Sequence, residues 1–250
     1  MLNLHTPAAP QSQDPCSNCL RHGQCLGASV QNAVRDDEGS CVTVTQLQRG
    51  QTLYRNGDAV NAVYVVQSGA LKSRRTSVQG DEEIVAFRLP GDTAGLDAIK
   101  ASRHGTEAVA LCTTRVCRVP LDTLRREMHE SAPVADALLA DLGGEIELLQ
   151  DRLQNDRLPA QARIAAFLLS QLQRRRRMFG AQIDHFTLPM TRVDLGRFLG
   201  LATETVSRMF TRLQADGVIA CDGNRIEIRD DAALQRRSQS ELNGALPQAA

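Results

Sequence analysis

The sequence predicts an α+β protein in which an antiparallel β domain precedes a long helix and a C-terminal helix-turn-helix with a β-hairpin wing. Three observations support this order. Short β-branched runs alternate with turn residues between positions 41 and 120. Apolar residues then recur every three or four positions from 135 to 153, and Gly200 separates two amphipathic stretches between 191 and 214.

Three apolar, β-branched runs occur in the first half of the chain. They occupy residues 41–45, 62–66 and 83–87. Turn sequences such as Asn56-Gly57-Asp58 stand between them and recur about every 10 to 12 residues. Short strands with frequent turns are typical of antiparallel sandwiches and barrels. We therefore expect residues 31–132 to form an antiparallel β domain.

A helical period follows the β domain. The apolar positions are Ala135, Leu139, Leu142, Ile146, Leu149 and Leu153. Successive members are four or three residues apart, which is the seam of a two-stranded coiled coil. We predict a dimerisation helix over 133–158, although a stripe of under three heptads could instead cover the β domain of its own chain. Gly143-Gly144 either weakens this helix or permits a close backbone approach.

The next helix is expected to begin with Pro159, a residue suited to the first helical position. It ends in four consecutive arginines, residues 174–177. Cations at a helix C-terminus complement the helix dipole. We interpret this run as a solvated helix end rather than as a separate basic patch.

Two short helices are expected in the last third of the chain. Thr191 precedes Asp194 by three residues, which is the capping-box spacing that starts a helix. Gly200 breaks that helix, and Thr203 is placed to cap a second helix over 203–214. The buried side of the second helix would hold Val206, Met209, Phe210 and Leu213. Its outer side would hold Glu204, Ser207, Arg208 and Thr211.

A β-hairpin wing is predicted after the second helix. Two short β-rich runs, 218–221 and 225–228, flank the turn sequence Asp222-Gly223-Asn224. Residues 159–232 therefore predict a winged helix-turn-helix domain.

The outer side chains of the second helix suit the major groove of DNA. Arginine can donate two hydrogen bonds to guanine, glutamate can accept one from cytosine, and serine can bond either way. The whole chain has a net charge of zero, yet residues 161–229 carry eleven arginines against six acidic side chains, a net charge of +5. A modestly basic domain of this kind suits phosphate contact. We therefore predict binding to double-stranded DNA.

Three of the seven cysteines stand close together near the N-terminus, in the pattern Cys16-x2-Cys19-x5-Cys25. Two thiolates two residues apart can chelate one metal centre, and a third at short range makes a chance origin improbable. Zinc with four sulfur ligands, a cubane iron–sulfur cluster and a redox disulfide would all accept this spacing. The pattern alone leaves these three alternatives open.

The second helix carries a family resemblance. Residues 204–208, preceded by 188–192 and 199–201, resemble the recognition motif of the CRP/FNR superfamily, which includes the catabolite activator and the fumarate and nitrate reductase regulator. Turns at 57–58, 68–69, 80–81 and 91–92 resemble the β-roll of that superfamily. The resemblance covers roughly residues 15 to 230.

The resemblance implies an architecture for the whole chain. It comprises an N-terminal tail with the cysteine segment (1–30), a cyclic-nucleotide-binding-like β-roll sensor domain (31–132), the dimerisation helix (133–158), the winged helix-turn-helix (159–232) and a flexible tail (233–250). Each protomer of a homodimer would read half of a palindrome resembling TTGAT-N4-ATCAA. The base-reading residues would be Glu204, Ser207 and Arg208. We assign backbone-positioning roles to Thr191, Arg192, Thr203, Thr205 and Arg212, and we expect RNA polymerase as a further partner.

The cysteines resemble those of the fumarate and nitrate branch, which has Cys-x2-Cys-x5-Cys ahead of the roll and a fourth cysteine later. The stretch Val116-Cys117-Arg118-Val119-Pro120 matches that later position. The resemblance implies an oxygen-labile [4Fe-4S] cluster held by Cys16, Cys19, Cys25 and Cys117, and DNA binding while that cluster is intact. A zinc-stabilised or thiol-redox regulator is the alternative. Cys112 is interpreted as a core residue or alternative ligand, and Cys41 and Cys221 as core thiols.

The cyclic-nucleotide pattern of the catabolite-activator branch is absent. Gly95 is followed by Leu96 where that branch has a glutamate for the ribose, and Thr106-Glu107 stands where it has an arginine-serine pair for the phosphate. A carboxylate there would repel a phosphate, so no cyclic nucleotide is expected. His5, His22 and His104 stand in no diagnostic haem motif.

Several function classes are disfavoured by the sequence. No run approaches the roughly 18 apolar residues that a membrane span needs, and residues 1–14 lack the basic and apolar regions of a secretory signal. We expect a cytoplasmic protein without a membrane partner. The chain has no Gly-rich phosphate loop, no nucleophile motif and no metal site with a companion base, so it is not expected to be an enzyme.

Overall fold

The computed structural model describes residues 16, 19, 25–34, 41–76, 80 and 82–239. Most of the expected N-terminal segment (1–30), with His5 and His22, and the last eleven residues lie outside this part. Within it, no helix combines the length and the apolar character that a membrane crossing requires.

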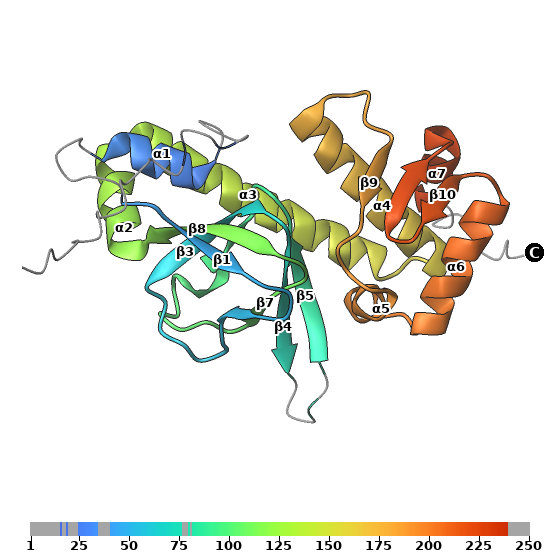
Figure 1. The fold of residues 1–250 in the computed structure, drawn as a ribbon, viewed down its shortest axis with the longest axis horizontal. Helices are drawn as coiled ribbons and strands as arrows, with labels where there is room; N and C mark the ends of the chain where they lie inside the picture. Colours follow the sequence, from blue (N-terminus) through green and yellow to red (C-terminus); the bar gives the residue numbers. More distant parts are fainter. Residues whose placement is uncertain are drawn as a thin grey trace, which may run out of the picture.

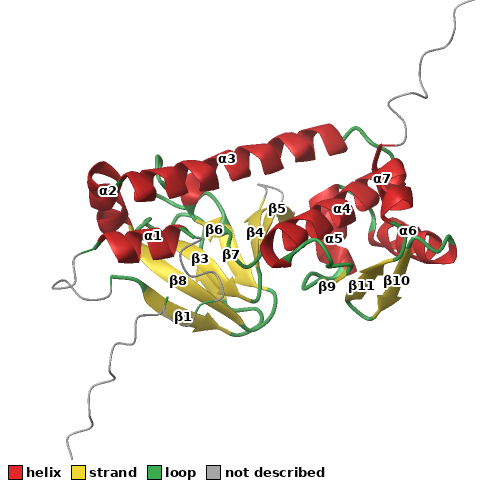
Figure 2. Ribbon diagram, turned by 90° about the horizontal axis from the view of Figure 1, so that it is seen from above, coloured by secondary structure: helices red, strands yellow, loops and turns green. Residues whose placement is uncertain are grey.

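Two antiparallel sheets form the N-terminal domain, and the strands are connected as a β-roll (Figures 1 and 2). The strands in chain order are β1 (Thr43–Leu47), β2 (Thr52–Tyr54), β3 (Ala62–Ser68), β4 (Leu71–Thr76), β5 (Glu82–Arg88), β6 (Thr93–Ala94), β7 (Glu107–Ala110) and β8 (Thr114–Pro120). One sheet has the order β1-β8-β3-β6 and the other β2-β7-β4-β5. A short 3-10 helix, η2 (Leu96–Ala98), follows β6. The predicted β domain and its β-roll topology are confirmed.

The apolar run of β3 is continuous because both faces of this strand are covered. Val66 points to the core between the two sheets, whereas Val63 and Val65 pack against the helices that lie on the outer face. All three side chains are at most 2% exposed. An unbroken apolar run is what a strand buried on both faces requires.

Three helices cover that outer face: α1 (Leu26–Ala33), α2 (Leu121–Glu130) and α3 (Ala132–Asn155). The first turns of α3 contribute Val134 and Leu138 to the core that they share with the roll. The rest of α3 extends toward the C-terminal domain (Figure 1). The predicted helix over 133–158 is therefore present and ends three residues earlier.

The predicted seam of α3 does not cover the β-roll of its own chain. Leu139, Leu142, Ile146, Leu149 and Leu153 are 36–69% exposed, although large aliphatic side chains usually lie in a core. Gly143 and Gly144 continue the helix, and a Cβ atom added at either would meet nothing within 4 Å. The alternative in which the stripe packs on its own roll is wrong.

A polar face of α3 binds the roll instead. Asp141 accepts a hydrogen bond from Thr93, Glu145 forms an ion pair with Arg88, and Arg152 donates to the carbonyl of Val85 at 2.9 Å. The Arg88 guanidinium is buried, and the Glu145 carboxylate offsets the cost of burying its charge. The acidic and basic residues that flank the seam therefore attach α3 to its own domain.

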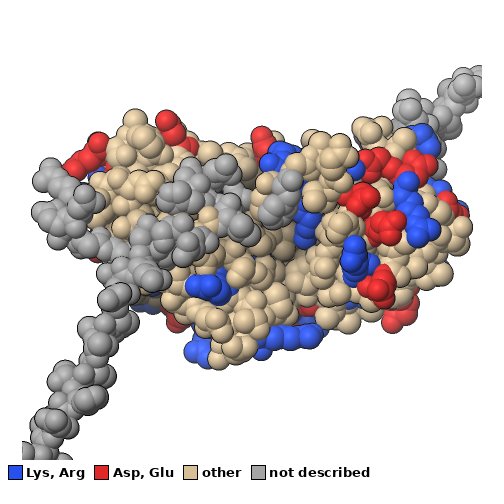
Figure 3. Space-filling view, turned by 45° about the horizontal axis from the view of Figure 1, so that its top comes forward, with Lys and Arg blue, Asp and Glu red and all other residues tan. Residues whose placement is uncertain are grey.

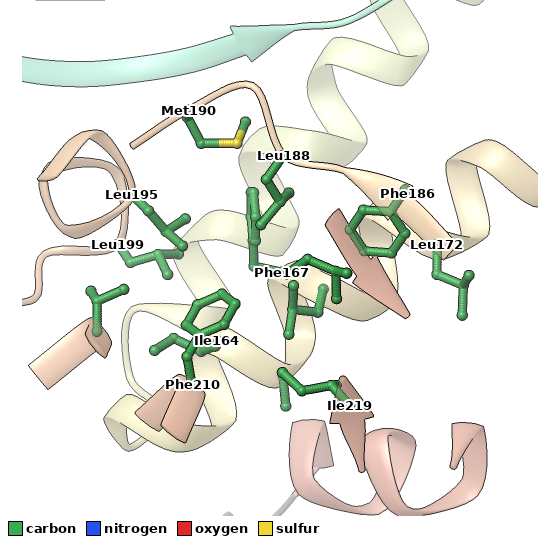
Figure 4. Close-up of a cluster of buried hydrophobic side chains, with 14 of the residues drawn as sticks. Ile164, Phe167, Leu172, Phe186, Leu188, Met190, Leu195, Leu199, Phe210 and Ile219 are labelled. Atoms are coloured by element: carbon green, nitrogen blue, oxygen red, sulfur yellow. The ribbon is translucent and has the colours of Figure 1, made fainter. Parts of the chain in front are cut away.

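The C-terminal domain packs around one apolar core, part of which Figure 4 shows. Its elements are α4 (Ala160–Phe179), β9 (His185–Thr187), α5 (Arg192–Leu199), α6 (Thr203–Ala215), β10 (Ile219–Asp222), β11 (Arg225–Ile228) and α7 (Asp231–Gln239). The predicted helix-turn-helix and hairpin wing are confirmed. The structure adds β9, which pairs with β11 and makes the wing three-stranded.

Three local expectations differ from the structure. Residues 233–239, expected in a flexible tail, belong to α7, whose Leu234 is fully buried in the same core. Pro159 is the N-cap of α4 rather than its first helical residue. The side-chain hydroxyl of Thr203 caps nothing, because Ala202 is the N-cap of α6 and no side-chain cap bond is present.

The arginine run of α4 is not a solvated helix end. Arg174 forms an ion pair with Asp92 of the roll, and Arg175 lies over the ring of Phe186 at 4.7 Å. Arg176 donates to the carbonyl of Ile183 at 2.8 Å. Three of the four guanidinium groups therefore make contacts with the protein, one with the roll and two within the C-terminal domain. Burial lowers the pKa of Arg175 to about 10.

One arginine fastens the connection between α3 and α4. Arg163 donates to the carbonyl oxygens of Asp156 and Leu158 in this connection, the latter at 2.8 Å. It also donates to the carbonyl of Leu199, at the end of α5, at 2.9 Å. The connection and the helix-turn-helix are thus held by the same side chain.

The capping box of α5 allows a stability prediction. Thr191 accepts from the backbone of Asp194 at 3.0 Å, and the Asp194 carboxylate accepts from the backbone of Thr191 at 3.1 Å. Thr191→Ala should lower the free energy of unfolding by about 1 kcal/mol. Thr203→Ala, the matched control, should change it by less than about 0.5 kcal/mol. Equal losses in urea unfolding followed by circular dichroism would contradict the assignment of the cap.

Candidate nucleic-acid interface and cysteine site

The turn between α5 and α6 is unusually close. A Cβ atom at Gly196 would lie 2.6 Å from the carbonyl oxygen of Leu201, so only glycine fits there. The backbone of Leu201 donates to the carbonyl of Gly196 at 2.9 Å, and Gly200 ends α5 with φ 64°. This approach sets the angle at which α6 leaves α5. The sequence shows Gly196 as an ordinary helical glycine, and its role was not predicted.

Helix α6 has one buried and one exposed side, as predicted. Val206, Phe210 and Leu213 are at most 2% exposed and anchor the helix in the core, whereas Met209, predicted on the same side, is half-buried against that core. Glu204, Ser207, Arg208 and Thr211 lie on the exposed side. The Ser207 hydroxyl donates to the carbonyl of Thr203 at 3.0 Å, so it presents acceptor lone pairs outward. The three expected base-reading residues therefore share one accessible face.

The expected backbone-positioning residues have different surroundings. The guanidinium of Arg192 lies 3.3 Å from the ring centre of Phe210, and burial lowers its pKa while Cys221 opposes that shift. Arg192 is therefore engaged within the domain. Thr191 is exposed but caps α5, Thr203 and Thr205 are half-buried, and Arg212 is exposed in the last turn of α6.

Charges of both signs cover the C-terminal domain. On the face shown in Figure 3, basic and acidic side chains are interspersed over it rather than segregated. Several of its cations are already paired, such as Arg237 with Asp216 at 2.6 Å. The accessible cations of α6, Arg208 and Arg212, are therefore more informative about a phosphate or base contact than the net charge of the domain.

The four cysteines of the sensor prediction come from three parts of the chain that meet at the roll. Cys25 is the N-cap of α1, and Cys117 lies on β8 beneath it, since a Cβ atom at Gly27 would contact Cys117 at 3.8 Å. The backbone of Cys19 donates to the carbonyl of Cys16 at 3.1 Å. Burial raises the pKa of Cys117 to about 11, with further contributions from Cys25 and Cys19.

Because Cys25 and Cys19 both act electrostatically on Cys117, these three expected ligands lie near one another. The fourth, Cys16, is buried. Among the side chains that the structure describes, no three His, Cys, Asp or Glu residues are placed to share a single metal ion. The thiols are therefore neighbours without forming a closed one-ion site.

The three remaining cysteines, Cys41, Cys112 and Cys221, have different surroundings. Cys112 is half-buried in the turn before β8, and the extended residues between Thr114 and Cys117 alone span about 10 Å. Cys41 contacts Gln31 of α1, with its sulfur 3.7 Å from the amide oxygen. Cys221 of β10 lies beside Arg192. All three are half-buried rather than fully buried, which qualifies the prediction of core thiols.

The interior of the roll is occupied by its own side chains. The rings of Tyr54 and His104 stack with centroids 3.7 Å apart, and the Cε1 atom of His104 lies 3.3 Å from the place where a Cβ of Gly95 would stand. Burial, and then Asp97, raise the pKa of Tyr54 to about 12. Glu107 belongs to the Thr106-Glu107 pair that stands in place of a phosphate-binding arginine-serine pair. Its carboxylate accepts a hydrogen bond from Arg74 at 2.8 Å, so its charge is neutralised within the protein.

The chain matches two known domain families. Residues 44–131 match the cyclic nucleotide-binding domain, and residues 162–237 match the Crp-like helix-turn-helix domain. Over 232 residues it is 35% identical to the fumarate and nitrate reduction regulatory protein of Escherichia coli strain K12, covering 92% of both chains. It is 34% identical to the anaerobic regulatory protein of Pasteurella multocida, covering 88% of this chain and 81% of that one.

Solved structures agree with these matches. FixK2 from Bradyrhizobium japonicum superposes with a TM-score of 0.72 at 31% identity, covering 80% of this chain and 98% of that one. A transcriptional regulator of the CRP family from Thermus thermophilus shares the fold at 20% identity with a TM-score of 0.62, covering 80% of this chain and all of the other.

Proposed function

Because this chain belongs to the CRP/FNR family of transcription regulators, we propose that it is an oxygen-responsive member that binds DNA while a [4Fe-4S] cluster is intact. The relatives are regulators and not enzymes, and the chain carries their DNA-binding domain. The observation that supports the oxygen-sensing part is that Cys25 begins α1 and Cys117 of β8 lies beneath the first turn of this helix, 3.8 Å from the place of a Cβ atom at Gly27.

The residues present fit a cubane cluster. Cys16, Cys19, Cys25 and Cys117 would each bind one of its four irons, so their sulfurs need a wider separation than four ligands of one zinc ion. Four cysteine thiolates are the usual ligand set of such a cluster. The bound cluster would supply an oxidisable iron–sulfide centre.

The position of Cys25 suggests how loss of the cluster would affect the protein. This residue begins α1, whose Leu26 and Val30 pack in the same core as Val134 and Leu138 of α3. Holding Cys25 therefore holds α1 against the helix that carries the dimer seam. Release of Cys25 would loosen this contact, and the arrangement of the two DNA-binding domains would change with it.

Anaerobic purification tests the cluster. The full chain should be coloured and contain about four iron and four sulfide per protomer, as a cubane cluster requires, and air should bleach it. Cys117→Ser should abolish the colour because it removes a ligand, while Cys112→Ser, the matched control, should keep it. A colourless wild-type protein with one zinc would favour the zinc-stabilised alternative and leave the DNA-binding function intact.

We propose that Glu204, Ser207 and Arg208 read each half of a TTGAT-N4-ATCAA-like palindrome, because they share the exposed face of α6. We propose that five further residues contact the DNA backbone and position the protein on it: Thr191, Arg192, Thr203, Thr205 and Arg212. For Arg192 this role would be indirect, through its stacking on Phe210.

Replacement of Arg208 tests the reading face. Arg208→Ala should weaken binding to a duplex with this palindrome by about 1–3 kcal/mol and relax the preference for guanine. Arg236→Ala removes the same charge from an exposed position on α7 and should have little effect. Fluorescence anisotropy with matched and guanine-substituted duplexes measures both. An unchanged preference in Arg208→Ala would exclude this residue as a base reader.

We propose that the exposed seam of α3 is the interface of a homodimer. Burying one Leu or Ile side chain is worth about 1.5–3 kcal/mol, so a second copy would cover a face that is unfavourable in water. Among its neighbours along the seam, Leu149 has only the apolar Ile146 and Leu153. The dimer is therefore proposed to persist after cluster loss.

Sedimentation velocity tests the seam. Leu149→Glu should convert a dimer into a monomer at micromolar concentration, because an unpaired charge would be buried. Val193→Glu places the same charge on another exposed apolar residue, in α5, and should leave the dimer intact. A monomeric aerobic wild-type protein would contradict persistence of the cluster-free dimer.

Other partners follow from the same function. We propose RNA polymerase as a partner and a cytoplasmic location, since the relatives are transcription regulators. We propose no cyclic nucleotide ligand. The stacked rings of Tyr54 and His104 fill space inside the roll, and Glu107 forms a hydrogen bond with Arg74.

A further inference from the structure

A group of charged side chains joins the β-roll to the helix-turn-helix. We call it the charge cluster, and its members are Lys72, Arg74, Glu82, Glu107, Asp194 and Arg197. The first four belong to β4, β5 and β7, and the last two to α5, whose ribbon lies near these strands in Figure 1. Three cations face three carboxylates, so the cluster is neutral.

Asp194 has two functions at once. One carboxylate oxygen accepts from the backbone and hydroxyl of Thr191 in the capping box, and the other accepts from the ammonium of Lys72 at 2.7 Å. Burial alone would raise the pKa of Asp194, but the bonds from Lys72 and Thr191 lower it. The first turn of α5 is therefore tied to β4 by a carboxylate that stays charged.

Glu82 is the centre of the cluster. Its carboxylate lies 3.0 Å from Lys72, 3.2 Å from Arg74 and 2.8 Å from Arg197. Burial raises its pKa, yet these three cations reverse the shift and lower it. Because the side chain of Glu82 is only 18% exposed, solvent and salt screen these pairs less than exposed ones. Arg74 extends the cluster to Glu107 at 2.7 Å.

An apolar contact lies beside the cluster but cannot fix an orientation alone. The rings of Phe87 and Phe198 are 5.0 Å apart at 52°, and Phe167 packs against both. Burial of apolar surface is non-directional, whereas ion pairs and hydrogen bonds have defined geometry. The aromatic rings join the two domains through an apolar contact, whereas the ion pairs of the charge cluster have a defined direction.

We propose that Lys72 and Glu82 of the β-roll are positioning residues for DNA binding, which orient α5, and through it the reading face of α6, without touching DNA. With α5 held against the roll, Glu204, Ser207 and Arg208 remain exposed, so the contact between the two domains does not cover this face of α6. Two recognition helices must meet half-sites about one helical turn apart, and a fixed orientation of α5 serves that requirement. The inference rests on the proposed DNA-binding function.

The test uses the full chain under anaerobic conditions and a duplex that carries the proposed palindrome. Lys72→Gln and Glu82→Gln should each weaken specific binding about tenfold, a coupling typical of sites linked through orientation. The double variant should be no weaker than the single ones, because both act in one network. Arg75→Gln removes a cation from an exposed position on the same strand and should bind as the wild type does.

The sign of the Glu82 effect separates positioning from direct electrostatics. Removing a negative charge near DNA would strengthen binding if only the long-range field mattered, whereas loss of orientation weakens it. The salt dependence separates the roles of Lys72. If Lys72 contacted a phosphate, Lys72→Gln would reduce the magnitude of the negative slope of log K against log salt by about 0.9. If Lys72 is a positioning residue, the slope stays unchanged. Tighter or unchanged binding in Glu82→Gln, or a reduced slope in Lys72→Gln, would overturn the proposal.

A second measurement does not depend on the proposed palindrome. If the wild type does not bind the duplex, the proposed palindrome is wrong. Hydrogen exchange without DNA then tests the charge cluster by itself. Backbone amides of α5 should exchange faster in Glu82→Gln than in Arg75→Gln, while those of α2 should not differ. Equal exchange of α5 in the two variants would overturn the proposal.

Discussion

The ion pair between Arg88 and Glu145 is the interaction on which the attachment of α3 to the β-roll depends. It places a buried guanidinium of the roll against α3, and breaking such a pair leaves an uncompensated charge in the interior. Together with the bonds of Asp141 and Arg152, it attaches α3 to the roll by polar groups. The apolar residues of α3 are thereby left for another surface, and the seam is exposed for that reason.

Much of the fold follows from local signals in the sequence. The β3 run, the capping box of Thr191 and Asp194, and the hairpin around Gly223 each depend on residues close in the chain, and each is present. What was missed depends on distant partners. Strand β9 exists because it pairs with β11, and α7 because Leu234 finds the core beneath α4. The arginines of α4 bind Asp92 and Asp231, partners that no local pattern identifies.

The candidate sites show the same division. The exposed face of α6 follows from helical periodicity and was predicted residue by residue, but Thr203 was given a capping role that Ala202 fills without a side-chain bond. The spacing of Cys16, Cys19 and Cys25 indicates a shared site, whereas the approach of Cys117 depends on how β8 passes beneath α1. The bond between Lys72 and Asp194 joins residues 122 positions apart, and only the folded chain reveals it.

The bonds of Arg163 have a consequence for how motion passes along the chain. The Arg163 side chain bonds to the carbonyls of Asp156, Leu158 and Leu199 and so links the connection after α3 to the end of α5. We expect a rotation of α3 to be transmitted to the helix-turn-helix through these bonds. In the proposed homodimer, a small change in the angle at which the two α3 helices cross would become a larger displacement of the two DNA-binding domains. The spacing between the two proposed reading faces would then depend on that crossing angle.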